Sequence, residues 1–388
     1  MNAKNRFSDK TAHPGKLVAA FVLIILLLAG CLPGRPRGEV TVYVAAPLSG
    51  FQANGGQTVV GGVRLMAEQL NRAGGLLGYR IKVVPMDDES DSDVAVAVAE
   101  EIKAAVEQGE RVLGVVGHYN SGQTLAAMEI YKDLPIIVIT PTASEVSLTR
   151  RGYRNFFRIN ADNAVQARIG ADYLVNTLGA KRVAVLYNDD PYGIDLGRLV
   201  AEELQALGAE VVFSQQVKVE QSRFAEEVKR IGASGADSIY YAGYEVECPY
   251  LRAELVEAGL DLTFMGSDGC FLAATIDESR NTAEGIYVTA FAPSPASVVD
   301  EAWIKAYQAV EYRNPDTYSI NGYVAMQVLA EGVKKAGSLD AGKVAEALHR
   351  IDLQTFVGRV RYDERGDLRE PQIYIFQVQG DEFVQVWP

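Results

Sequence analysis

From residue 39 onward, short continuous apolar runs alternate with longer amphipathic stretches. This alternation predicts strands joined by helices. We expect strands over 39–47, 80–85, 111–117 and 135–140, and helices over 58–73, 93–108 and 123–132. The run Val-Leu-Gly-Val-Val at 112–116 has no polar position, as in a parallel sheet covered by helices on both faces. The pattern therefore indicates an α/β fold.

The alternation then begins again, which predicts a second doubly wound lobe. Here we expect helices over 164–178, 197–207, 223–231 and 246–259, and strands over 182–187, 210–217, 237–242 and 262–266. From Thr289 the pattern changes to long helices over 298–313, 319–336 and 341–350. A strand-rich region over 355–388, with a turn at 364–367, completes the chain.

The first thirty residues carry the pattern of an export signal. Basic residues precede an apolar run from Leu17 to Leu28, which is shorter than the roughly 20 residues of a membrane-spanning helix. The run ends in Leu-Ala-Gly-Cys at 28–31, which resembles the bacterial lipobox. The resemblance implies that 1–30 is a lipoprotein signal peptide, that Cys31 receives lipid and that 31–38 is a tether. A plain signal peptide with an incidental Cys is the alternative.

The net charge and the spacing of cysteine and histidine residues exclude some classes of partner and bound group. Without residues 1–30, which hold four of the 37 basic and one of the 50 acidic residues, the net charge is −16. Such a surface repels phosphate backbones, so we expect no nucleic-acid partner. Three widely separated histidines and no CxxC or HExxH spacing give no support for a metal site, and no cofactor is expected.

Polar residues follow directly on the expected strands, where an open α/β sheet binds its ligands. After the strands expected over 111–117 and 135–140, a first series of residues offers hydroxyls and backbone N–H groups that suit a carboxylate. The residues are Tyr119, Asn120, Ser121, Thr142 and Ser144. On local pattern alone, Ser121 and Ser144 are more simply interpreted as N-caps.

The second series offers a carboxylate and aromatic rings. Tyr192, Tyr244 and Asp268 each follow an expected strand. Together with the first series, they would complement a zwitterion. An Asp-Gly pair also favours a turn or a helix cap, which is the alternative interpretation of Asp268.

From Glu39 to its end, the chain resembles the branched-chain amino acid-binding protein family, of the leucine/isoleucine/valine-binding type. The matching segments occur in order over some 350 residues, at 47–50, 87–97, 117–121, 139–144, 240–244, 264–269 and 362–368. The resemblance implies a type I periplasmic-binding-protein fold, in which two Rossmann-like lobes joined by three crossovers close by a hinge. The lobes are expected over 39–162 plus 291–372, and over 163–290 plus 373–388.

The resemblance also implies roles for individual residues. Ser121 matches the serine that binds the ligand carboxylate. Thr142 and Ser144 match positions that bind this carboxylate through backbone groups and a hydroxyl. Tyr192 and Tyr244 match second-lobe tyrosines of the site. Asp268 matches the acidic residue, usually Glu, that holds the α-ammonium, so its contact could be longer or bridged by water.

Several positions depart from the branched-chain pattern. Gly55 stands where some relatives have an aromatic residue over the ligand side chain. Tyr119 and Asn120 replace apolar or disulfide-bonded residues, Ser90 replaces the other half of that disulfide, and Tyr318 matches an aromatic wall. We therefore expect a pocket that is roomier on one side and more polar on another.

The resemblance implies an extracytoplasmic substrate-binding lipoprotein of an ABC importer. Its ligand would be a free amino acid or amino-acid-like zwitterion, and its partners membrane permease subunits with separate ATPase subunits. We expect a monomer, exported and lipid-anchored to the outer face of the cytoplasmic membrane or in the periplasm. A ligand-sensing receptor component, or a binder of an amide or aromatic acid, is the alternative.

Enzyme activity is not expected. The residues around Ser121 do not form the GxSxG nucleophile elbow, and His349, the last histidine, lies in an expected helix. Cys248 and Cys270 each follow a strand of the second lobe, so they could form a disulfide in an oxidising compartment. Two separate buried thiols are the alternative.

Overall fold

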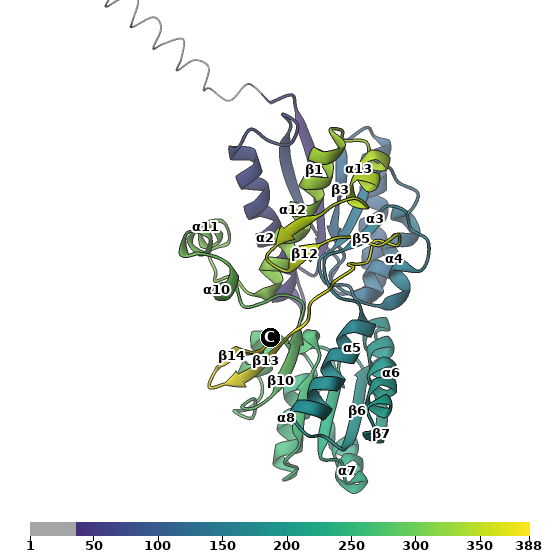
Figure 1. Ribbon diagram of the computed structural model, residues 1–388, viewed down its shortest axis with the longest axis vertical. Coiled ribbons are helices and arrows are strands. Elements are labelled where there is room, and N and C mark those ends of the chain that lie inside the picture. Colours follow the sequence, from purple (N-terminus) through teal and green to yellow (C-terminus); the bar gives the residue numbers. More distant parts are fainter. Residues whose placement is uncertain (1–35) are drawn as a thin grey trace, which may run out of the picture.

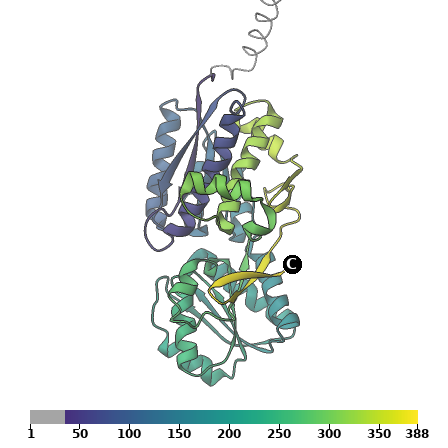
Figure 2. The ribbon, with the colours of Figure 1, turned by 90° about the vertical axis from the view of Figure 1, so that its left-hand side faces the viewer.

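The computed structural model describes residues 36–388, which form two α/β lobes stacked along the long axis of the molecule (Figure 1). The view turned by 90° shows the same two bodies, with the C-terminus between them (Figure 2). The expected signal peptide, Cys31 and most of the expected tether lie outside the described residues. Among the described helices, none is long and apolar enough to cross a membrane.

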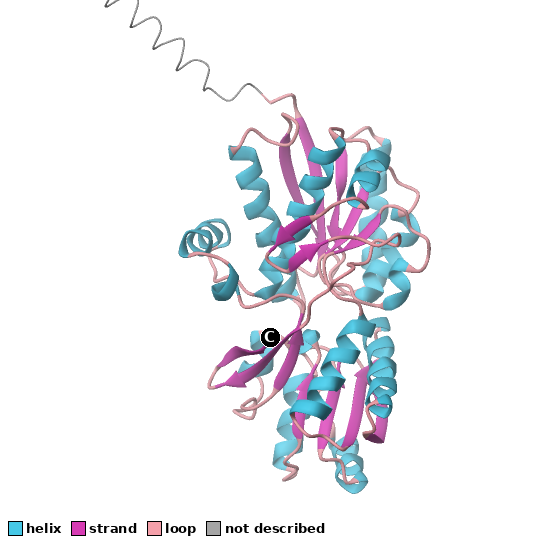
Figure 3. Ribbon diagram, viewed as in Figure 1, coloured by secondary structure: helices cyan, strands magenta, loops and turns pink. Residues whose placement is uncertain are grey.

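The first lobe contains a five-stranded sheet in which all paired strands are parallel. Its order is β2 (Arg80–Asp87), β1 (Glu39–Ala46), β3 (Val112–Gly117), β4 (Ile137–Thr140) and β5 (Phe156–Arg158). Helices cover both faces (Figure 3). Those that follow β1, β2 and β3 are α2 (Ala53–Arg72), α3 (Ser92–Glu107) and α4 (Ser121–Tyr131).

The second lobe contains a seven-stranded sheet. Its order is β14 (Glu382–Trp387), β13 (Tyr374–Gln379), β10 (Tyr287–Ala290), β9 (Thr263–Gly266), β8 (Ser238–Ala242), β6 (Arg182–Asn188) and β7 (Glu210–Val217). Strand β13 pairs antiparallel with both β10 and β14, and the other pairs of strands are parallel. Its helices are α5 (Asn163–Asp172), α6 (Pro191–Ala206), α7 (Ala225–Ser234), α8 (Cys248–Glu257) and α9 (Ala273–Asp277).

The chain passes between the two sheets three times. It leaves the first after β5, returns after β10, and enters the second again at β13. The returning segment comprises α10 (Pro295–Val298), α11 (Glu301–Glu311), α12 (Thr317–Ala336), α13 (Ala341–Leu348), β11 (Leu353–Thr355) and β12 (Gly358–Val360). This architecture confirms the expected fold class.

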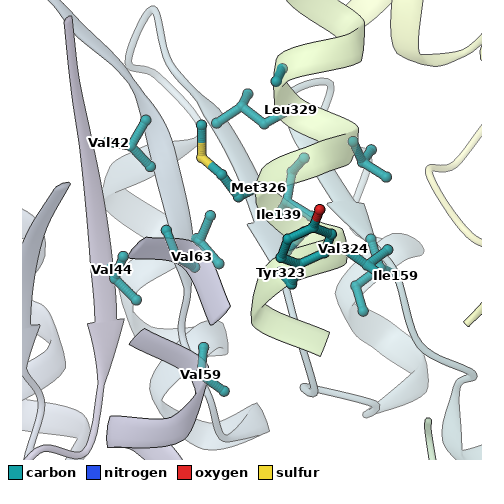
Figure 4. Close-up of a cluster of buried hydrophobic side chains, with 14 of the residues drawn as sticks. Val42, Val44, Val59, Val63, Ile139, Ile159, Tyr323, Val324, Met326 and Leu329 are labelled. Atoms are coloured by element: carbon teal, nitrogen blue, oxygen red, sulfur yellow. The ribbon is translucent and has the colours of Figure 1, made fainter. Parts of the chain in front are cut away.

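The first-lobe core brings α12 against α2 and the sheet. Figure 4 shows side chains of β1, α2, β4 and α12 gathered in this cluster. The two helices approach closely at Gly62 and Gly322. A Cβ at Gly62 would lie 2.0 Å from the Ser319 carbonyl oxygen, and one at Gly322 would lie 2.1 Å from that of Val59. Larger residues would push the helices apart, so these glycines allow the start of α12 to pack directly against α2.

Two details differ from the sequence-based expectation. Helix α2 begins at Ala53, not at residue 58, and includes Gly55 and Gly56. The reason is close packing, because a Cβ at Gly56 would lie 1.8 Å from the Pro47 carbonyl oxygen. The short strands β5 and β10 were not expected either; each is only three or four residues long.

Cys248 and Cys270 are both free and buried, so the structure contains the second alternative and not the disulfide. Both side chains belong to the apolar core of the second lobe. Burial, followed by the neighbouring Cys248 thiol, raises the pKa of Cys270 well above its ordinary value. Within residues 36–388, no group of three His, Cys, Asp or Glu side chains is placed to hold a metal ion.

Candidate functional site

A small cavity lies between the lobes, beyond the carboxyl ends of the strands of both sheets. All nine binding residues expected from the sequence line it, with three others; the lining is Gln52, Tyr119, Asn120, Ser121, Thr142, Ala143, Ser144, Tyr192, Tyr244, Asp268, Gly269 and Tyr318. The open space within it is about 20 Å³, room for about one water molecule. A larger ligand could therefore enter only after the lobes have moved apart.

Ser121 is the first residue of α4 and not its N-cap. The N-cap is Asn120, whose side chain makes no capping hydrogen bond. Ser121 Oγ instead accepts hydrogen bonds of 3.1 Å from the backbone N–H groups of Ser144 and Glu145. Its own proton is left to donate, and the first N–H groups of α4 lack intrahelical partners. The N-cap interpretation of Ser121 is therefore wrong.

The turn after β4 adds a second hydroxyl. Ser144 Oγ is buried and has no hydrogen-bond partner among the described residues, and Glu145 is the N-cap of the short helix that follows. The N-cap interpretation of Ser144 is therefore also wrong. Thr142 Oγ1 donates to the Tyr119 carbonyl oxygen over 2.5 Å, which ties the two turns together. Ser121, Ser144 and the start of α4 thus form a donor set for an anion.

A buried pair of side chains, His118 and Asp88, holds the turn that carries this donor set. His118 Nδ1 lies 2.7 Å from Asp88 Oδ2, and both side chains are almost fully buried. The His118 carbonyl oxygen accepts from Thr140 Oγ1 over 2.9 Å. These contacts connect the ends of β2, β3 and β4, so they fix the turn that presents Ser121.

Asp268 supplies the negative charge on the opposite side. Its Oδ1 accepts from Tyr192 Oη over 2.6 Å and from Gln166 Nε2 over 2.7 Å. Burial raises the pKa of Asp268 to about 6, and these hydrogen bonds oppose the rise. Ser267 is the N-cap of the short helix that Asp268 begins, so Asp268 is not a helix cap. It does lie in a tight turn, since the Phe271 N–H donates to its carbonyl oxygen over 2.8 Å, so the turn half of the alternative holds.

Four tyrosines enclose the cavity. The rings of Tyr192 and Tyr244 stack with centroids 5.5 Å apart and an angle of 10°. Those of Tyr119 and Tyr318 meet at 56° with centroids 5.2 Å apart. Tyr318 Oη donates to the Asp268 carbonyl oxygen over 2.6 Å, a contact between α12 of the first lobe and the second lobe. The four tyrosine rings therefore enclose the space between Asp268 and the uncharged donor set.

The expectation of a roomier pocket is wrong on the Gly55 side. A Cβ at Gly55 would lie 2.5 Å from Tyr119 Oη and 3.3 Å from Leu272 Cδ1. The Tyr119 side chain thus takes the space that the missing side chain of Gly55 leaves.

The polar side of the pocket includes residues that the sequence reasoning missed. Gln52 Oε1 accepts from Asn120 Nδ2 over 2.6 Å and from Ser90 Oγ over 2.8 Å. Gln52 precedes α2, and Gln166 lies within α5, so neither directly follows a strand end. The sequence reasoning searched for polar residues that directly follow a strand, so it could not identify Gln52 or Gln166.

The charge of the site is one-sided. Within the described chain, the lining of this cavity contains one carboxylate, Asp268, and no Lys, Arg or His. The donor set of the first lobe is uncharged. A ligand with a carboxylate at one end and an ammonium at the other would satisfy both. A larger groove on the outside of the second lobe, between α7 and α8, is lined by none of these residues.

Comparison with known proteins shows the family to which the chain belongs. The family model described as periplasmic binding protein matches residues 39–382. An amino acid binding protein of Pseudomonas aeruginosa is 33% identical over 346 residues, covering 87% of this chain and 90% of that protein. A leucine-, isoleucine-, valine-, threonine- and alanine-binding protein of the same organism is 30% identical, covering 88% and 90%.

Solved structures share the fold. The branched-chain amino acid transporter substrate-binding protein LivJ from Streptococcus pneumoniae, in complex with isoleucine, has a TM-score of 0.81 and 22% identity, with 90% of this chain and 100% of that chain covered. A solute-binding protein of an ABC transporter from R. palustris, in complex with benzoate, has a TM-score of 0.79 and 20% identity, with 90% and 96% covered.

Proposed function

The chain belongs to the periplasmic binding protein family, and from this premise we propose that it delivers a free amino acid to an ABC importer. The family's relatives are solute-binding proteins, so the chain is not an enzyme. Family membership also implies an extracytoplasmic location. The amino acid ligand and the importer role are our proposal.

One observation carries the choice of ligand: the cavity opposes a buried carboxylate with an uncharged donor set. Asp268 would hold the α-ammonium, while Ser121, Ser144 and the start of α4 would bind the α-carboxylate. A buried charge is costly unless it is paired, so Asp268 favours a cationic group. The relative that binds leucine, isoleucine, valine, threonine and alanine supports this ligand class.

The same observation disfavours the aromatic-acid alternative. Benzoate, the ligand of the R. palustris protein, has a carboxylate but no amine. In this site it would leave Asp268 without a counter-charge. An amide ligand would have the same defect, because an amide group carries no positive charge.

Ligand binding would be coupled to closure. The lobes proposed to move as bodies are 39–162 plus 291–372, and 163–290 plus 373–388. A zwitterion that contacts Ser121 in one lobe and Asp268 in the other stabilises the closed state, because only that state offers both contacts. The closed complex would dock on permease subunits, with lipid on Cys31 keeping the monomeric protein at the membrane.

Native mass spectrometry of freshly purified protein, followed by a thermal-shift screen of the twenty amino acids, tests the proposal. We expect at least one amino acid to raise Tm in a concentration-dependent way, since a ligand that binds the folded state stabilises it. The Asp268→Asn variant is the matched control and should lose this shift. Stabilisation by benzoate or an amide, with no response to any amino acid, would contradict the proposal.

A further inference from the structure

Arg158 is a buried cation in β5, beside the turn that carries Ser144. Its exposed fraction is 0%, and no other Lys or Arg of the described chain is buried. Arg158 Nε and Asp367 Oδ1 lie 2.6 Å apart and form an ion pair. A buried charge is costly unless it is paired and its hydrogen-bonding groups are satisfied. The partners of the other guanidinium nitrogens therefore show what this charge does.

The guanidinium group binds the turn after β4 on both sides of Ser144. Arg158 Nη1 donates to the Ala143 carbonyl oxygen and Nη2 donates to that of Glu145, each over 3.2 Å. Nη2 also donates to Thr149 Oγ1 over 3.1 Å. Arg158 is not among the residues that line the cavity, so it acts on the turn and not directly on a ligand.

One peptide group connects Arg158 to Ser121. The carbonyl group of Ala143 and the N–H group of Ser144 belong to this peptide group, and the N–H donates to Ser121 Oγ over 3.1 Å. The hydroxyl proton of Ser121 is left to donate to a ligand. Hydrogen bonds in a chain polarise one another, so the cation at one end makes the Ser121 hydroxyl a stronger donor at the other. An ionised carboxylate gains more from such a donor than an uncharged acceptor does.

The ion pair is oriented with its positive end toward the turn. The Asp367 side chain is 21% exposed and that of Arg158 is 1% exposed, so water screens the carboxylate more than the guanidinium. The turn expected at 364–367 brings Asp367 to this place, because the Arg158 N–H donates to the Gly366 carbonyl oxygen over 3.2 Å. The donor set, which contains no charged side chain, therefore has a cation behind it that Asp367 neutralises only in part.

Asn160 binds the same turn without a charge. Its Nδ2 donates to the Thr142 carbonyl oxygen over 3.1 Å and to that of Ala143 over 3.3 Å. Asn160 is also buried. Asn160 and Arg158 therefore both fix the shape of this turn, and of the two only Arg158 adds positive charge.

We propose that Arg158 is a positioning residue for the carboxylate end of the site and sets its preference for an ionised carboxylate. This inference rests on the proposed function and deepens it, since it assigns to one residue the selectivity for a free α-carboxylate over an uncharged α-carboxamide. Arg158 acts through the peptide group between Ala143 and Ser144, and through Ser121, without contacting the ligand.

Calorimetric titration with each L-amino acid that raises Tm, and with its α-carboxamide, tests the inference. L-leucine and L-leucinamide are the first pair, because a relative binds leucine. We expect the wild-type protein to bind the amino acid about tenfold or more tightly than the carboxamide, since hydrogen bonds to an ionised acceptor are the stronger ones. Asp367→Asn removes the counter-charge of Arg158 and should raise this ratio by about threefold or more. Arg158→Met combined with Asp367→Asn removes both charges and should lower the ratio by a similar factor.

Asn160→Ala is the matched control. It loosens the same turn without changing its charge, so it should weaken binding of both compounds and leave their ratio unchanged. An unchanged ratio in Asp367→Asn or in the double variant would overturn the inference, as would an equal change of the ratio in Asn160→Ala. Asp367→Asn decides the question alone if the double variant does not fold. Each of these results would leave the proposed function standing, because the amino acid still binds, whereas failure of all twenty amino acids to bind would overturn both.

Discussion

Tyr318 Oη donates a hydrogen bond of 2.6 Å to the backbone carbonyl oxygen of Asp268. Tyr318 lies in the first turn of α12, which packs on α2 in the first lobe, and Asp268 follows β9 in the second. The contact therefore joins the lobes at the residue proposed to hold the ligand ammonium. If the lobes close on the ligand as proposed, this contact would couple closure to the proposed ammonium site.

We expect Tyr318→Phe to weaken ligand binding by about 0.5–1.5 kcal/mol, the net worth of one hydrogen bond. The loss should come from a less stable closed state, so small-angle scattering should show less compaction at a given ligand concentration. Tyr307→Phe is the control, because Tyr307 Oη donates to the Thr58 carbonyl oxygen within the first lobe. Equal effects of the two variants on binding would argue against a role in closure.

Asp268 should destabilise the ligand-free protein at neutral pH. Its pKa is raised to about 6 in the folded state from its ordinary value of 3.8, so its contribution to stability is fully present below pH 3.8 and is lost as the pH rises through 6. Asp268→Asn should therefore be more stable than the wild type above pH 6, by up to about 3 kcal/mol, and similar to it at pH 4. Urea unfolding at pH 4 and pH 8 measures this. A wild type that is the more stable protein at pH 8 would refute it.

Substitution of Ser121 and of Ser144 should affect the stability of the protein differently, but should weaken ligand binding to a similar extent. Each hydroxyl should contribute about 1–2 kcal/mol to binding, because backbone donors remain when it is removed. Ser144→Ala removes an unpartnered hydroxyl and should leave Tm nearly unchanged. Ser121→Ala also removes the acceptor of two backbone N–H groups, so its Tm should fall. Calorimetric titration and thermal unfolding of both variants check this, and identical Tm values would contradict the geometry.

Anchoring is tested separately, because Cys31 lies outside the described residues. The lipobox-like segment at 28–31 predicts cleavage before Cys31 and addition of lipid to it. Intact mass of protein extracted from membranes should show a chain that starts at residue 31 with added acyl mass. A mature chain without that mass, or a Cys31→Ala variant that stays in the membrane fraction, would count against the lipid.

The sequence predicted the fold class because strand and helix periodicities are local, and it found nine cavity residues by their position after strands and by family resemblance. It missed Gln52 and Gln166 for a physical reason. Gln166 reaches Asp268 from the middle of a helix, and Gln52 is positioned by Asn120 and Ser90 from other segments. The space above Gly55 is likewise filled by Tyr119, a distant residue. Such contacts depend on tertiary packing, which no local pattern records.

The central claim is that Asp268 holds the α-ammonium of an amino acid. Calorimetric titration of the wild type and Asp268→Asn with the amino acid identified in the thermal-shift screen, and with its α-hydroxy analogue, tests it most directly. We expect the variant to lose about 2–4 kcal/mol of binding free energy for the amino acid, because a buried ammonium would lack its counter-charge. The wild type should discriminate against the α-hydroxy analogue, and the variant much less. Unchanged affinity of Asp268→Asn for the amino acid would contradict the account.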